Sequence, residues 1–91
     1  MAMLVGADLA ALQQLEASFR RESEAVAALQ SRVHAQVVGT ESLWTGPAAQ
    51  QFRDRWHQHF VRALAELSEA LRTNADVVRS RHDAIERATG L

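Results

Sequence analysis

The feature that most constrains this chain is a seven-residue spacing of apolar residues in its first third. The series comprises Val5, Leu12, Phe19, Val26 and Val33. Residues seven apart lie on one face of an α-helix, because seven residues make almost two full turns. The pattern predicts an amphipathic helix over about residues 7–38, with Asp8 as its N-cap. Gly39 follows the last periodic residue, in the place where a C′ glycine ends a helix.

A second periodic segment begins after Pro47 and continues to about residue 88, before Gly90. Proline fits the first turn of a helix, where its missing N–H is not needed. Its apolar residues form three adjacent rows, namely Leu64, Leu71, Val78 and Ile85; Phe60 and Leu67; and Trp56, Ala63, Ala70, Val77 and Ala84. With Phe52 added, the apolar arc is wider than one partner helix would cover.

Residues 39–46 combine turn chemistry with a lack of periodicity, so they are the candidate connection between the two helices. A connection this short makes the helices antiparallel neighbours. We therefore predict an all-α fold in which residues 1–91 form a single helix-turn-helix hairpin domain, with helices over about 7–38 and 47–88.

A two-helix hairpin has one seam, which seldom gives more than marginal stability at this size. Seventeen of the 91 residues are alanines, which bury little apolar area. We infer that the surplus apolar arc faces a second hairpin, so that a dimer forms a four-helix bundle. The residues expected in the hairpin and dimer seams are Leu12, Phe19, Val26, Phe52, Trp56, Phe60, Leu64, Leu67, Leu71 and Val78. Asn74 and Arg81 interrupt one row, either to select a partner or as a partly exposed edge of the seam.

Several classes of function find no support in the composition. The chain has ten basic residues, all arginine, and eleven acidic residues, so no strong field would attract nucleic acid. It has no cysteine for a disulfide or a thiolate site. His57 and His59 stand two residues apart on a helix and point about 200° apart, so they cannot share one metal ion. His34 stands alone and is expected to be an exposed or satisfied polar residue.

No hydrolase motif or glycine-rich phosphate loop is present, so we expect a protein that is not an enzyme. Cofactors, metals, nucleic acid and small-molecule substrates are likewise not expected. The first eight residues lack the basic region of a secretory signal peptide, and no segment approaches the roughly 18 apolar residues of a membrane span. On these local features alone the chain would be cytoplasmic.

Trp44-Thr45-Gly46 lies where the periodicity independently places the turn. Gly46 relieves the backbone constraint there, and Trp44 can either cover the end of the bundle or be offered to a partner. An aromatic residue, Phe52, follows the glycine by six positions, and Trp56 follows Phe52 by four. With this motif and its length of 91 residues, the chain resembles the WxG family of ESAT/CFP-like proteins, small substrates of type VII secretion in actinobacteria and firmicutes.

The resemblance implies a hairpin that pairs as a homodimer, or as a heterodimer with a related WxG protein. It also implies secretion of the folded dimer from the cytoplasm by an apparatus driven by a type VII secretion ATPase, without a classical signal peptide. Arginine in place of lysine in an alanine-rich chain indicates a GC-rich genome, which fits an actinobacterial source. Two alternatives remain on the same fold, an intracellular adaptor or chaperone domain and a secreted effector that acts on membranes. The chain has no basic amphipathic face, so a membrane is not an expected partner.

The chain departs from the family at its C-terminal export signal, which is a tyrosine followed four residues later by an acidic residue. No tyrosine is present, and the nearest counterpart is His82 with Glu86. These two residues share a helix face and are expected to form an i,i+4 pair; the alternative is a degenerate export signal. If the pair is merely structural, the chain would leave the cell on the signal of its partner.

Overall fold

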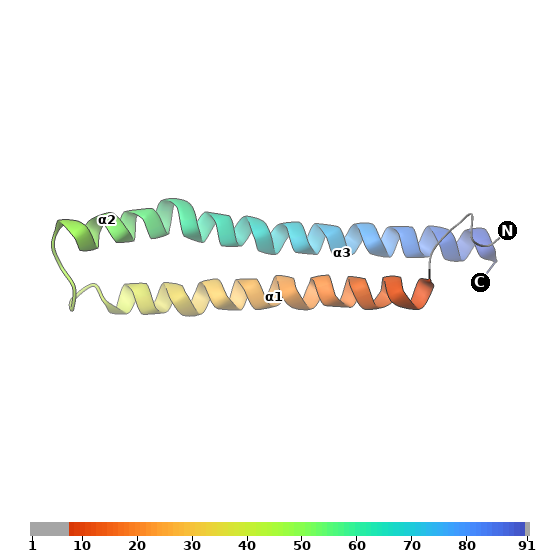
Figure 1. Ribbon diagram of the computed structural model, residues 1–91, viewed down its shortest axis with the longest axis horizontal. Helices are drawn as coiled ribbons and strands as arrows, with labels where there is room; N and C mark the ends of the chain where they lie inside the picture. The colour runs from red at the N-terminus through yellow and green to blue at the C-terminus, as the bar shows by residue number, and fades with distance from the viewer. Residues whose placement is uncertain (1–7, 91) are drawn as a thin grey trace.

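The computed structural model describes residues 8–90, in which the first helix, α1, runs from Leu9 to Gly39 (Figure 1). Asp8 is its N-cap, as predicted, and accepts a hydrogen bond from the backbone N–H of Ala11 at 3.2 Å. At the other end Gly39 is the last helical residue, and Thr40 caps the helix by donating from its N–H and its hydroxyl to the Val37 carbonyl. The C′ role predicted for Gly39 is therefore wrong.

The second arm of the molecule contains three consecutive helical segments. Helix α2 (Pro47–Arg55) is followed by a π-helical turn (Trp56–Phe60) and then by α3 (Val61–Thr89). Gly46 precedes α2 with a φ of 104°, and Gly90 ends α3 in the left-handed conformation with a φ of 76°. Both backbone angles favour glycine over other residues. The single uninterrupted helix predicted for residues 47–88 is thus incorrect at one point, the π-helical turn.

The two arms lie side by side and antiparallel, which confirms the predicted all-α helix-turn-helix hairpin (Figure 1). The hairpin measures 67 × 16 × 15 Å. Its connection spans residues 40–46 at one end, and α1 begins beside the end of α3 at the other, which we call the open end. The expected helix start at residue 7 and the heptad position of Val5 lie outside the described residues. Within residues 8–90, none of the helices is long and apolar enough to cross a membrane.

Each arm contributes two rows of residues to the seam between the arms. One row of α1 contains Leu12, Phe19, Val26 and Val33, and one row of α3 contains Leu64, Leu71, Val78 and Ile85; all are half-buried. These are the heptad series that the sequence marks most clearly. The second rows are Glu16, Ser23, Gln30 and Val37 in α1, and Val61, Ser68, Ala75 and His82 in α3.

The second rows make the seam unusually small and polar. Ser23, Ser68 and His82 are among its buried residues, and Ala75 is completely buried. No large side chain is completely buried anywhere in residues 8–90. Because hydrophobic stabilisation scales with the apolar area removed from water, this seam gives the isolated hairpin a limited driving force to fold.

The π-helical turn determines which face of α3 enters the seam. In α2 the seam residues are Ala49 and Arg53, followed by Trp56 in the π-helical turn. An uninterrupted α-helix would continue this pattern to Phe60 and Leu67, at steps of four and seven residues. In the π-helical turn the Val61 N–H instead donates to the carbonyl of Trp56, five residues back, which adds one residue to the turn. The seam therefore continues through Val61, and the row that contains Phe60 and Leu67 turns away from α1.

Candidate interaction surface

A reciprocal hydrogen-bonded contact between Ser23 and Ser68 defines the symmetry of the hairpin. The hydroxyl of Ser23 donates to the carbonyl of Ser68 at 2.6 Å, and the hydroxyl of Ser68 donates to the carbonyl of Ser23 at 2.9 Å. Because the two serines make the same bond in both directions, they are related by a local two-fold axis. This axis is perpendicular to the plane that contains the two antiparallel helices. Residues in equivalent positions on the two helices therefore lie on the same side of that plane.

Five of the nine large hydrophobic side chains that are exposed within residues 8–90 lie on one side of the hairpin. Leu15 and Leu29 immediately precede the seam residues Glu16 and Gln30, just as Phe60 and Leu67 precede Val61 and Ser68. The local two-fold places these four on the same side, and Val77 lies further round α3 on that side. We call this set the apolar side; its exposed fractions are 43% for Leu15, 42% for Leu29, 50% for Phe60, 48% for Leu67 and 51% for Val77.

The opposite side of the hairpin carries the ion pairs between the two arms. Arg20 contacts Asp76 at 2.9 Å, and Arg79 contacts Glu16 at 3.6 Å. Glu16 also pairs with Arg20 within α1 at 2.9 Å. Two charged partners raise the pKa of Arg20, chiefly through hydrogen bonds to Asp76 and Glu16. The two long sides of the hairpin thus differ in chemistry, because among residues 8–90 the ion pairs that join the two arms all lie on this opposite side.

The predicted seam residues divide between the seam inside the hairpin and its outer surface. The seam inside the hairpin contains Leu12, Phe19, Val26, Trp56, Leu64, Leu71 and Val78. Phe60 and Leu67 belong to the apolar side, and Phe52 is 41% exposed near the turn. Asn74 and Arg81 are exposed and, by their spacing from Leu67, continue the apolar side toward the open end.

The turn that contains Trp44 is held by an arginine that the sequence did not single out. Arg53, on α2, donates from Nη2 to the Thr40 carbonyl at 2.8 Å and to the Trp44 carbonyl. Its guanidinium also lies 5.9 Å from the centre of the Trp44 ring, within cation–π range. Phe52 packs beside the same indole, with ring centres 5.7 Å apart. These contacts hold the turn in place. Trp44 is nevertheless 43% exposed, so part of its indole faces solvent.

Trp56 and His34 form a hydrogen bond between the arms next to the π-helical turn. The indole N–H of Trp56 donates to Nδ1 of His34 at 3.0 Å, and Trp56 is buried. An indole nitrogen is only a donor, so Nδ1 of His34 must be unprotonated in this arrangement. His34 is thus a satisfied polar residue, as expected.

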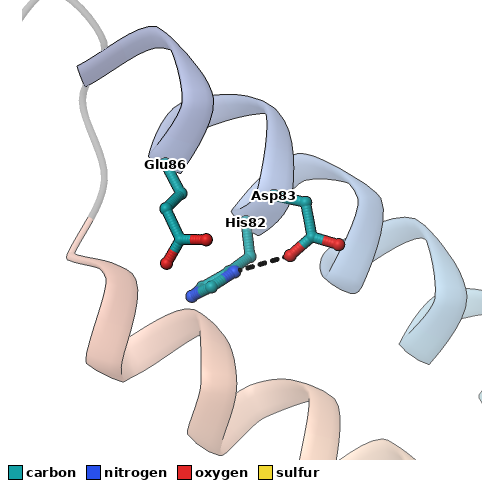
Figure 2. Close-up of side chains that lie close together, drawn as sticks. All are labelled: His82, Asp83 and Glu86. Carbon is teal, nitrogen blue, oxygen red and sulfur yellow. Dashed lines mark hydrogen bonds and ion pairs between the residues drawn. The ribbon is translucent and has the colours of Figure 1, made fainter. Parts of the chain in front are cut away.

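His82 and Glu86 do not form the i,i+4 pair predicted for them. Instead, Nδ1 of His82 lies 3.0 Å from Oδ1 of Asp83, the next residue along α3 (Figure 2). The hydrogen bond from His82, followed by attraction to Arg79, lowers the pKa of Asp83 below its usual value. His82 is only 7% exposed, because its ring is buried against α1. The side chains of His82, Asp83 and Glu86 still offer ligand atoms within 4.8 Å of one another.

Compared with models of known protein families, with curated proteins and with solved structures, the chain gives no match. The WxG resemblance therefore depends on the motif, its position in the turn and the length of the chain.

Proposed function

We propose that this chain is a non-enzymatic helical-interaction protein whose apolar side pairs with a second hairpin to complete a four-helix bundle. The observation that carries the proposal is the exposure of five large hydrophobic residues on one side of a hairpin whose own seam is small and polar. Pairing through that side would remove this apolar surface from water and supply the core that the hairpin lacks. Ala63, Ala70 and Ala84 lie next to it and would permit close approach of a partner helix.

The partner that fits this surface is another amphipathic hairpin, either a second copy or a related WxG protein. The apolar side is elongated and runs along both arms, as a helical partner requires. Three polar or charged residues on this side, Glu22, Asn74 and Arg81, would set the register or the choice of partner.

Within this class we propose the role of a secreted substrate, or the dimer partner of one, in a type VII secretion system. Support comes from the WxG-type triplet at the turn, from Phe52 packed against Trp44 and from the hairpin architecture itself. The partly exposed indole of Trp44 would be available to the secretion machinery, including its ATPase.

The location of His82 favours export on the signal of a partner. A recognition signal must be accessible, whereas His82 is buried against α1 and bonded to Asp83. We therefore propose that His82 and Glu86 are not a degenerate export signal in the folded hairpin, and that this chain is the signal-poor member of a heterodimer.

Light scattering of the purified chain, alone and co-expressed with the protein of the neighbouring gene, tests the pairing. We expect a complex of two hairpins in the wild type, and its loss in Leu67→Asp, because the new carboxylate would lie buried in the interface. Ala65→Asp is the matched control and should pair normally, because Ala65 is exposed and is equivalent by the local two-fold to Arg20, on the opposite side of the hairpin. Circular dichroism of both variants checks that the helices persist. A Leu67→Asp chain that still pairs would contradict the proposed surface.

Secretion is tested separately in the native host. We expect the chain in the culture filtrate of the wild-type strain and its retention in cells that lack the secretion ATPase or the partner gene. A chain retained in the cell under all conditions would instead identify an intracellular adaptor. Leakage of liposomes caused by the purified chain would identify a membrane-acting effector.

A further inference from the structure

A hollow near the open end of the hairpin brings together the main cluster of metal-ligating side chains within residues 8–90. It has a volume of about 350 Å³ and is lined from both arms by Gln13, Glu16, Arg79, His82, Asp83 and Glu86. None of these residues belongs to the apolar side or to the Trp44 turn. The hollow is therefore independent of the surface proposed for pairing.

His82 is the buried residue of this cluster, and its ring is oriented by Asp83. The carboxylate of Asp83 can only accept a hydrogen bond when it is ionised, so Nδ1 of His82 carries the proton in their 3.0 Å contact. In the neutral imidazole with this tautomer, the other ring nitrogen, Nε2, carries a free lone pair. No hydrogen bond from Nε2 to any residue in the 8–90 range is found, and Figure 2 shows that nitrogen on the same side as the Glu86 carboxylate.

This arrangement matches the way proteins prepare a histidine for metal binding. Ligating histidines commonly donate their second ring N–H to a carboxylate, which fixes the tautomer and makes the free nitrogen more basic. Glu86 follows His82 by four residues, one turn of the helix, so both side chains emerge on one face. His82 therefore supplies a pre-oriented nitrogen and Glu86 a nearby oxygen.

The charges around the hollow favour a cation. Three carboxylates, those of Glu16, Asp83 and Glu86, face the hollow against the guanidinium of Arg79. Arg79 lies 3.6 Å from both Glu16 and Asp83, and Arg20 also pairs with Glu16, so these two carboxylates are partly neutralised. Glu86 makes no ion pair with another described residue, so its carboxylate is not occupied by a basic side chain of residues 8–90.

We propose that this hollow binds a divalent transition-metal cation of the Zn²⁺ type, with Nε2 of His82 and the carboxylate of Glu86 as its ligands on α3. Asp83 holds the imidazole through Nδ1, so both protein ligands of the ion come from α3. A nitrogen ligand favours Zn²⁺, Ni²⁺ or Cu²⁺ over Mg²⁺ and Ca²⁺, which take oxygen ligands. An ion bound in this hollow, which is lined from both arms, would stabilise the folded hairpin over the unfolded chain.

Isothermal titration of the purified, tag-free full-length chain with zinc chloride tests the site. We expect saturable binding of one ion per chain, with a rise in the thermal midpoint of unfolding in the same buffer, and no comparable effect of magnesium chloride. Glu86→Gln, nearly isosteric, should weaken zinc affinity at least tenfold, and His82→Asn should do the same.

His59→Asn is the matched control, because His59 is an exposed histidine in the π-helical turn, far along the chain from the cluster. It should leave zinc affinity unchanged. Zinc binding that is unaffected by Glu86→Gln, or that is lost in His59→Asn, would overturn the proposal, as would no detectable binding to the wild type. Glu86→Gln keeps the buried His82 ring in place, so the test remains valid if His82→Asn fails to fold. Both readouts are made on the chain alone and do not depend on secretion or on a partner.

Discussion

Ser23 and Ser68 each donate a hydroxyl hydrogen bond to the backbone carbonyl of the other, which brings the two helices together at the middle of the seam. Their hydroxyl oxygens lie 3.1 Å apart, and both residues are buried. A contact between side chain and opposing backbone in both directions requires small side chains on both helices. The pair also fixes the register of the hairpin, because a shift by one residue would break both bonds at once.

Substitutions at Ser68 should therefore respond to size more than to the loss of one hydrogen bond. Ser68→Ala should lower the free energy of unfolding by about 1 kcal/mol, the usual net value of such a bond. Ser68→Leu should cost about 1–3 kcal/mol or more, because it overpacks the closest approach of the helices. Urea denaturation followed by circular dichroism gives both values. Equal effects of the two substitutions would contradict the close approach at this position.

The hydrogen bond between Trp56 and His34 predicts that residue 34 must carry a hydrogen-bond acceptor. His34→Leu would leave the buried indole N–H without its acceptor, which should lower the free energy of unfolding by about 1–3 kcal/mol. His34→Gln offers an amide oxygen to the same N–H and should recover much of that loss. The comparison uses urea denaturation at pH 7. If leucine were tolerated as well as glutamine, the bond would not stabilise the hairpin.

Asp83 gives a pH dependence whose sign follows from its lowered pKa. The hydrogen bond from His82 and the charge of Arg79 favour the ionised carboxylate in the folded chain. A carboxyl group whose pKa is lower in the folded than in the unfolded state adds stability that is complete above the unfolded pKa, about 3.9 for aspartate. That contribution is lost as the pH falls through the lower, folded value. Asp83→Asn should therefore unfold at a lower temperature than the wild type at pH 7, and the difference should shrink below about pH 4. Thermal scans are made with a chelator present, so that metal binding does not contribute, and a difference that grows in acid would contradict the assigned cause.

The most regular apolar rows of the sequence predict the hairpin well because they form half of its seam. The row through Leu12 and the row through Leu64 are spaced for one face of a helix, and both lie against the opposite arm. The other half of the seam leaves no apolar pattern. Glu16 and Ser23 look like surface residues in the sequence, and the close approach of the helices that accommodates Ser23 is a property of the folded pair.

The apolar side can also be predicted only in part from the sequence. The excess of apolar rows on the second arm predicts that one row must remain outside the seam. Which row does so depends on the π-helical turn, and helical periodicity alone cannot locate one added residue. Arg53 was missed for a related reason, since an arginine in a polar stretch of helix gives no sign that it will bind the carbonyls of Thr40 and Trp44.

The π-helical turn itself leads to the sharpest test of the fold. Deletion of Gln58, an exposed residue within Trp56–Phe60, should convert the π-helical turn to a regular α-helix. The seam residues of α2 and α3 would then follow one continuous seven-residue repeat, so both halves of the arm would still face α1 with the same residues. We expect unchanged helix content and a free energy of unfolding at least as high as in the wild type, because π-helical hydrogen bonding is rarely favoured over α-helical.

Deletion of Thr73, an exposed residue inside the regular helix α3, is the matched control. It should strongly destabilise the hairpin, because every seam residue beyond it would rotate by about 100°. Circular dichroism with urea denaturation ranks the three chains. A deletion of Gln58 as damaging as that of Thr73 would contradict the prediction, because it would show that the arm needs all five residues of Trp56–Phe60 to keep its two halves in phase.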